Sequence, residues 1–227
     1  MHRLDIINYL IKKYNFNTYL EIGISGGWVL NRVNAKNKLG VDPDWRVYVM
    51  QGEFPLREDK LMMDKSWTPH IPYGSVIANI IIICEESDKF FAELNPDVKF
   101  DIVFIDGLHI SDQVFRDITN SIKHLNKNGA IVVHDCNPPT KENASTEHRD
   151  GIWNGTTYLG YIDANITYDI KYYTVDTDWG CGVMFPRDVN LNVERKYCSD
   201  DWNYFNVNRK DLLNLIGVEE FIKIMNT

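Results

Sequence analysis

The sequence predicts a single α/β domain built on a mostly parallel sheet. Two apolar runs in the middle of the chain, 102–105 and 130–133, flank a stretch in which apolar residues recur every three or four positions. Strands joined by such a crossover helix run parallel and lie side by side, with both faces of the sheet covered. The length of 227 residues and the hydrophobic content of 44% suit one domain with a full core.

The first strand of the predicted sheet ends at Glu21 and runs into a turn that contains Gly23, Gly26 and Gly27. Glycines in such a turn let backbone amides approach a ligand closely. The next strand ends at Asp42, nineteen residues after Gly23, which is close to the spacing at which an acidic residue accepts hydrogen bonds from ribose hydroxyls. The two strand ends therefore predict a nucleoside-binding edge.

The remaining elements alternate in the same way. They are helices at 3–13, from Ser87 onward and at 153–162, a third strand at 76–84, and an antiparallel strand pair at 168–175 and 181–185. Residues 200–227 predict a C-terminal helical extension. No second domain is predicted, so 1–227 form one domain.

Residues 45–75 contain three prolines and no sustained period, and they predict an elaborated loop or lid. Two roles are open for its large apolar residues. These residues are Met50, Met62, Met63 and Trp67. They either line a pocket for the methyl acceptor or anchor the loop to the core.

The order of several short motifs resembles the class I S-adenosylmethionine-dependent methyltransferases. The motifs are YLEIGISGG, GVDPD, EESDKFF, FDIVFIDGLH, NGAIVVHDCNP and WNGTTY, and FIDGLH and HDCNP point to a branch of small-molecule or sugar O-methyltransferases. The resemblance implies a Rossmann-like seven-stranded sheet in the order 3-2-1-4-5-7-6, with strand 7 antiparallel and helices on both faces. With the glycine turn, it implies these residues for binding S-adenosylmethionine: Glu21, Gly23, Ser25, Gly26, Gly27, Asp42, Ser87, Asp88 and Asp106.

Two acids, Asp106 and Asp135, follow the two central strands and leave the sheet at the same edge. Neighbouring strands lie about 5 Å apart, so both carboxylates can stay ionised and face each other only beside a compensating positive charge. In one mechanism Mg²⁺ supplies that charge, is bound by Asp106, Asp135 and Asn137, and lowers the pKa of the acceptor hydroxyl. Cys136 departs here from the adjacent Asp-Asn pair of related metal-dependent enzymes.

In a second mechanism His109 or His134 is the general base and no metal takes part, because an imidazole titrates near neutrality. Both histidines lie next to the strand-end acids, so the predicted catalytic residues are Asp106, His109, His134 and Asp135. Of the two mechanisms, we favour the one with Mg²⁺.

The predicted activity is methylation of a hydroxyl on a small molecule such as a sugar, a sugar nucleotide or a hydroxylated metabolite. A net charge of −8 and the lack of a basic run argue against nucleic acid as a partner. The sequence shows no signal peptide and no membrane span, which favours a cytoplasmic protein with reduced cysteines, and a homodimer through the C-terminal helices is one option. The alternatives are a nicotinamide- or nucleotide-binding oxidoreductase and a catalytically silent nucleoside-binding module.

Overall fold

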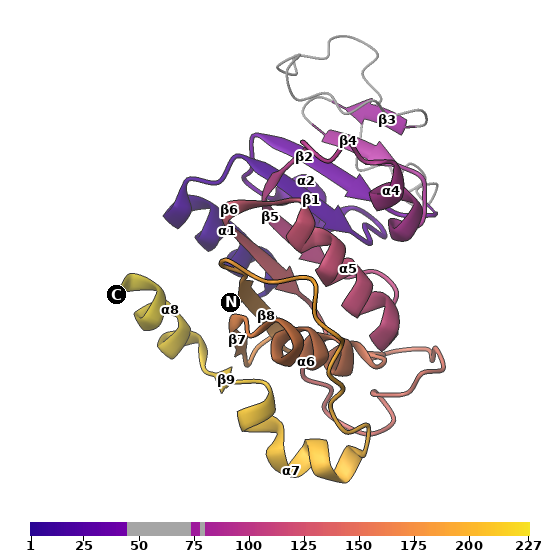
Figure 1. Cartoon of the computed structure of the whole chain (residues 1–227), viewed down its shortest axis with the longest axis vertical. Helices are drawn as coiled ribbons and strands as arrows, with labels where there is room; N and C mark the ends of the chain where they lie inside the picture. Colours follow the sequence, from indigo (N-terminus) through magenta and orange to yellow (C-terminus); the bar gives the residue numbers. More distant parts are fainter. Residues whose placement is uncertain (45–73, 78–79) are drawn as a thin grey trace.

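The computed structural model describes residues 1–44, 74–77 and 80–227, and one mixed sheet runs through this part of the chain (Figure 1). The described strands lie in the order β3-β4-β2-β1-β5-β6-β8-β7-β9. They are β1 (Thr18–Ile22), β2 (Asn37–Val41), β3 (Gly74–Ile77), β4 (Ile80–Ile83), β5 (Phe100–Ile105), β6 (Leu125–Val133), β7 (Lys171–Val175), β8 (Cys181–Phe185) and β9 (Leu215–Ile216).

Seven of these strands confirm the predicted sheet order. Read from β4 through β2, β1, β5, β6 and β8 to β7, the sheet reproduces 3-2-1-4-5-7-6, and β8 pairs antiparallel with β6 as predicted. From β4 through β2, β1 and β5 to β6, each strand runs parallel to its neighbour. The carboxyl ends of these five strands therefore meet at one edge of the sheet. β3 and β9 extend the sheet at its two sides and were not predicted.

The prediction of one strand over 76–84 was wrong. The structure has two strands there, β3 and β4, which pair antiparallel with Ile77 opposite Ile80. Residues 76–84 are apolar apart from Asn79, and hydrophobicity alone does not show where such a run reverses direction.

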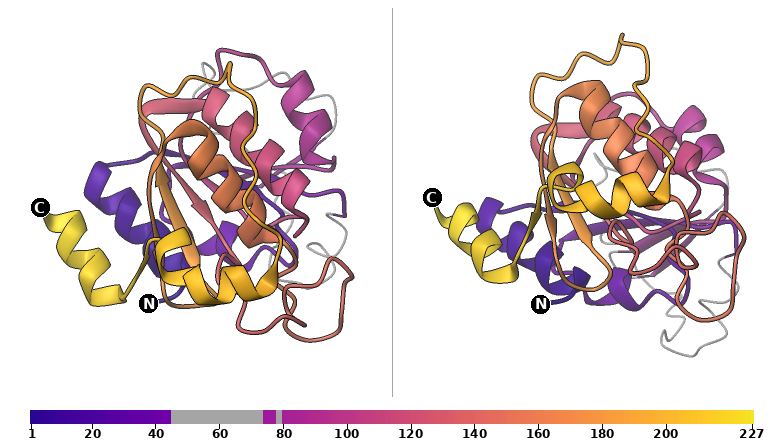
Figure 2. Two further views of the ribbon diagram at one scale, coloured as in Figure 1. Left: turned by 60° about the horizontal axis from the view of Figure 1, so that its bottom comes forward. Right: turned by 90° about the horizontal axis from the view of Figure 1, so that it is seen from below.

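Helices cover both faces of the sheet, as predicted (Figure 2). On one face lie α4 (Ser87–Glu93), α5 (Ser111–Lys123), α6 (Thr157–Tyr168) and α7 (Trp202–Leu212), whose apolar residues share a core with strand residues such as Leu20, Val103 and Ile131. The other face is covered by α1 (Arg3–Tyr14), α2 (Trp28–Arg32) and α8 (Val218–Asn226), which pack on the alternate strand residues. None of the described helices is long and apolar enough to cross a lipid bilayer.

Some boundaries differ from the prediction. The helix expected at 153–162 is α6 and begins four residues later, because Asn154 and Gly155 form a turn whose backbone amides both bond to the carbonyl of Asn143. The extension at 200–227 contains α7 and α8 with the short strand β9 between them. The predicted loop at 45–75 lies outside the described residues apart from the start of β3, and so do its methionines and tryptophan.

Candidate active site

A cavity of about 490 Å³ opens where β1, β2, β4 and β5 end, and we call it the edge cavity. Five of the predicted cofactor-binding residues line it, namely Gly23, Ser25, Asp42, Ser87 and Asp106. Its volume lies within the range of about 300 to 1,000 Å³ that is typical of small-molecule sites. A larger cavity of about 870 Å³ between α6 and residues 141–149 and 195–202 contains none of the predicted site residues.

The glycine turn after β1 is held against the neighbouring strand ends. Gly23 has a φ of +82°, and a Cβ atom there would collide with the backbone of Asp106. One carboxylate oxygen of Asp42 accepts hydrogen bonds from the backbone amides of Ile24, at 2.9 Å, and Ser25, at 3.0 Å. The turn thus requires glycine at position 23, and Asp42 fixes the path of the chain beside the cavity.

Four other residues predicted to bind the cofactor do not line the edge cavity. Glu21 is buried below it, accepts a hydrogen bond from the Tyr19 hydroxyl, and has its pKa raised by burial to about 8. Gly27 precedes α2, and Gly26 lies in the turn next to it. Asp88 forms an ion pair with Arg116 at 3.0 Å and accepts a hydrogen bond from Gln113 at 3.2 Å.

The structure brings together all four predicted catalytic residues. The Nδ1 atom of His134 lies 3.2 Å from Oδ1 of Asp106 and 3.1 Å from Oδ2 of Asp135. The Nε2 atom of His109 lies 3.4 and 3.5 Å from the same two oxygens. Two imidazoles therefore bridge the two carboxylates that were expected to face each other.

The charges of this group shift one another's pKa values. Burial acts to raise the pKa of Asp106, but the charge of His134 and the hydrogen bond from His109 hold it well below its usual value. Burial acts to lower the pKa of both histidines, and the carboxylates outweigh it, so the pKa of His109 is raised and that of His134 is raised well above the usual value. The acids therefore stabilise the cationic form of each imidazole relative to its neutral form.

The ring of His109 has a fixed orientation. Its Nδ1 lies 3.0 Å from the carbonyl oxygen of Trp153, to which it donates, and its ring stacks on the Trp153 indole with centroids 5.0 Å apart. Gly155, with a φ of +59°, packs so closely on the His109 backbone that a Cβ atom would collide with it. These contacts leave Nε2 as the atom of His109 that faces the acids and can exchange a proton there.

Arg3, at the start of α1, belongs to the same group and was missed, because the sequence around it shows the pattern of a helix and no motif of a charged site. Its guanidinium lies 3.0 Å from Oδ2 of Asp106 and 3.3 Å from Nδ1 of His134, and its Nε donates to Asp178 at 2.9 Å. Asp178 lies in the turn between β7 and β8. We call Arg3, Asp106, His109, His134, Asp135 and Asp178 the charged cluster.

Asn154 is a second residue that the sequence did not single out, although it lies in the quoted motif WNGTTY. It is completely buried, and its amide nitrogen donates to Oδ1 of Asp135 at 2.5 Å. Asp135 has a φ of +59°, which is unusual for a residue with a side chain. The hydrogen bond from Asn154 helps to hold Asp135 in this conformation, with its other oxygen turned to the histidines.

The charged cluster does not fit Mg²⁺. The predicted third ligand, Asn137, points elsewhere, because its amide oxygen accepts from Arg209 at 2.6 Å and its nitrogen donates to Asp176. One ligand atom each of Asp106, His134 and Asp135 lies within 4.8 Å of the others, but Mg²⁺ prefers oxygen ligands to an imidazole. The Arg3 guanidinium also occupies an oxygen of Asp106.

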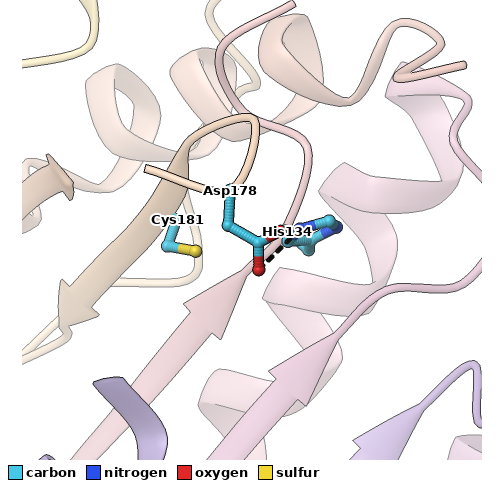
Figure 3. Close-up of side chains that lie close together, drawn as sticks. All are labelled: His134, Asp178 and Cys181. Carbon is cyan, nitrogen blue, oxygen red and sulfur yellow. Dashed lines mark ion pairs between the residues drawn. The ribbon is translucent and has the colours of Figure 1, made fainter. Parts of the chain in front are cut away.

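A second group of potential metal ligands lies behind His134. Figure 3 shows Asp178 and Cys181 beside this histidine, and one ligand atom of each of the three lies within 4.8 Å of the others. Burial raises the pKa of the Cys181 thiol to about 12, and the carboxylate of Asp178 already forms an ion pair with Arg3. Both effects oppose a cation, so we assign no metal site to this group.

Comparison with known proteins identifies the family. A family model described as a methyltransferase domain matches residues 20–136, which is just over half of the chain and contains the edge cavity and most of the charged cluster. The chain belongs to this family of methyltransferase domains. The prediction of a class I S-adenosylmethionine-dependent methyltransferase is confirmed. No match was found among curated protein sequences.

Solved structures of methyltransferases share the fold of this one. The O-methyltransferase TomG from Streptomyces achromogenes is 14% identical, with a TM-score of 0.53 over 82% of this chain and 79% of TomG. The methyltransferase PaMTH1 from Podospora anserina is 12% identical, with a TM-score of 0.53 over 82% of this chain and 78% of its own. A putative caffeoyl-CoA O-methyltransferase from Staphylococcus aureus is 14% identical, with a TM-score of 0.52 over 81% and 82% of the two chains.

Proposed function

We propose that this methyltransferase methylates a hydroxyl oxygen of a small molecule, with His109 as proton acceptor and without Mg²⁺. The observation that carries the proposal is the position of Asp106. It lines the edge cavity and also bonds to both histidines of the charged cluster, so a bound cofactor and a proton acceptor would be neighbours. S-Adenosylmethionine supplies an electrophilic methyl group on a sulfonium.

The residues around the edge cavity suit this cofactor. The open backbone at Gly23 and Ser25 would receive its amino-acid part, and Asp42 would accept hydrogen bonds from its ribose. TomG was solved with S-adenosylmethionine and PaMTH1 with S-adenosylhomocysteine, which supports the same ligand here.

The charged cluster supports a role for His109 as the base. In the neutral form of His109, Nε2 can take the proton of an acceptor hydroxyl. Asp106 and Asp135, which raise the pKa of His109, stabilise the imidazolium that results. Arg3 and His134 supply the positive charge that two facing carboxylates require. A metal ion is therefore not needed to balance this pair of acids.

Two observations bear on the class of the methyl acceptor. TomG and the Staphylococcus aureus protein are both described as O-methyltransferases, the latter as putative, which favours oxygen as the accepting atom. The net charge of −8 disfavours polyanionic acceptors. A sugar, a sugar nucleotide and a hydroxylated metabolite all fit these limits.

The test is to incubate the purified protein with S-adenosylmethionine and fractionated hydroxylated metabolites, and to search by mass spectrometry for a compound that gains one methyl group. The proposal expects the same rate with and without EDTA. A rate that vanishes in EDTA and returns with Mg²⁺ would restore the metal mechanism. A change in tryptophan fluorescence with NAD but not with S-adenosylhomocysteine would overturn the proposed cofactor.

A further inference from the structure

One buried carboxylate oxygen at the edge cavity has no role in the mechanism above. Asp117 lies in the middle of α5, is completely buried and lines the cavity. Its Oδ1 accepts hydrogen bonds from the Ser87 hydroxyl at 2.6 Å and the Gln113 amide nitrogen at 3.0 Å. Its Oδ2 has no hydrogen-bond partner among the described residues.

An unpaired carboxylate oxygen away from water is unfavourable, and burial raises the pKa of Asp117 to about 6. A carboxylate only accepts hydrogen bonds, so the group that would satisfy Oδ2 has to be an N–H or O–H donor. The two residues at Oδ1 are both donors, and they fix which oxygen is left for a ligand.

The position of Asp117 indicates which part of a nucleoside would reach it. The edge cavity is lined by the glycine turn after β1, by Asp42 after β2, and by Ser87, Gln113 and Asp117 from α4 and α5. With the turn assigned to the amino-acid part and Asp42 to the ribose, the three helix residues are left for the base. Adenine carries one exocyclic donor, its 6-amino group. We propose that Asp117 selects adenine by accepting a hydrogen bond from this 6-amino group.

This proposal rests on the proposed function, since it assumes S-adenosylmethionine as the cofactor. It concerns Asp117 on α5, which lies 75 positions after Asp42, the residue proposed to bind the ribose. It does not depend on the charged cluster. It assigns a specificity-determining role, which can be measured by binding alone.

The experiment compares two ligands by calorimetric titration. One is S-adenosylhomocysteine, and the other is its analogue in which hydrogen replaces the 6-amino group. The wild-type protein is expected to bind the first at least about tenfold more tightly, because the analogue leaves Oδ2 unpaired. Equal affinities would overturn the role of Asp117 while leaving the cofactor in place. Failure to bind either ligand would overturn both this inference and the proposed cofactor.

Asp117→Asn sharpens the result. Ser87 and Gln113 donate to one side of the side chain, so the amide oxygen should stay there and the amide nitrogen should replace Oδ2. A donor would then face the 6-amino group, and the variant is expected to lose the preference for S-adenosylhomocysteine. Asp117→Leu removes both oxygens at similar volume and should give the same loss if the asparagine variant does not fold. A preference retained in a folded variant would overturn the proposal.

Asp112→Asn is the matched control on the same helix. Asp112 is largely exposed, pairs with Arg195 at 2.7 Å and does not line the edge cavity. This variant is expected to keep the wild-type ratio of the two affinities. A ratio lost equally in Asp112→Asn would show a general effect of charge on α5 and would overturn the assignment to Asp117.

Discussion

The edge cavity and the charged cluster share Asp106 but are built from different kinds of contact. The cavity is shaped by backbone: Gly23 allows a turn against β5, and Asp42 binds two amides of that turn. The cluster is shaped by side-chain charge, with Arg3 and two histidines set among three carboxylates. Substitutions in the cavity should therefore change ligand affinity, whereas those in the cluster should change turnover and its pH dependence.

The largest effect is expected from Gly23→Ala, which should abolish binding of S-adenosylhomocysteine. The added methyl group would collide with the backbone of Asp106, and the positive φ adds strain. Gly151→Ala is the control, because Gly151 also has a positive φ, +92°, but open space around it. Both variants should lose about 1 kcal/mol or more of unfolding free energy, measured by denaturant titration. Normal binding in Gly23→Ala would place the cofactor elsewhere.

His109→Gln should lower turnover by about 10²- to 10⁴-fold with little change in cofactor affinity. His148→Gln is the matched control, since His148 also contacts the Trp153 ring but is exposed and apart from the acids. Steady-state rates and calorimetry on both variants check this. Full turnover in His109→Gln would assign the base to another residue, with His134 the next candidate.

The pH profile gives a second measure of His109. A base has to be neutral to accept a proton, and the carboxylates raise the pKa of His109, so the acidic limb of kcat/KM should lie above the ordinary imidazole value of about 6.5. Asp135→Asn removes one of the charges that raise this pKa. The limb should then move to lower pH, and an unmoved limb would mean that it reports another group.

Arg3→Ala should cost about 3 kcal/mol of unfolding free energy and reduce turnover, because Asp106 and Asp178 both lose a partly buried cationic partner. Arg3→Lys keeps the charge without the planar fork and should retain part of both properties. Denaturant unfolding monitored by fluorescence distinguishes them. If the alanine variant is as stable as the wild type, Arg3 does not balance the charged cluster.

A smaller effect is expected for Asp42→Asn, about a tenfold loss in affinity for S-adenosylhomocysteine. The amide oxygen can still accept both hydrogen bonds from Ile24 and Ser25, but the charge that strengthens a ribose hydrogen bond is gone. Calorimetric titration is the measurement. Unchanged affinity would show that Asp42 supports the turn alone.

Asn137→Ala is expected to have the smallest effect, a change in turnover of less than about threefold. Its side chain bonds to Arg209 and Asp176, outside the charged cluster. A role as a metal ligand would instead make the variant nearly inactive. Turnover assayed with and without added Mg²⁺ separates the two outcomes.

The two regions also differ in how far the sequence predicts them. Gly23 and Asp42 directly follow consecutive strands, and their spacing indicates a nucleoside site. Asp106, His109, His134 and Asp135 were predicted to lie together because they follow or end neighbouring parallel strands, whose carboxyl ends meet at one edge of the sheet. Arg3 carries no such signal, since its partners become neighbours only in the folded chain.

Asn137 shows the opposite error. It was predicted to be a metal ligand because it follows Asp135 closely in the sequence, but its side chain lies outside the charged cluster. The chain turns sharply there, with Asp135 at positive φ and the amide of Asn137 bonded to the Trp179 carbonyl at 2.8 Å. This pairing with the β7–β8 turn directs the Asn137 side chain away. A backbone reversal of that kind depends on a partner 42 residues later and has no local pattern.

The reach of Arg3 has a consequence for folding. The side-chain hydrogen bonds of Asp42 and Ser87 at the edge cavity join residues 30 or fewer positions apart, and the contact of Gly23 with Asp106 spans 83. Those of Arg3 span 103 positions to Asp106 and 175 to Asp178. Closing long loops costs chain entropy and slows folding. During refolding from denaturant, we expect ligand binding to return before methyl transfer, because the catalytic charges assemble only when the first helix meets the last strand pair of the core sheet.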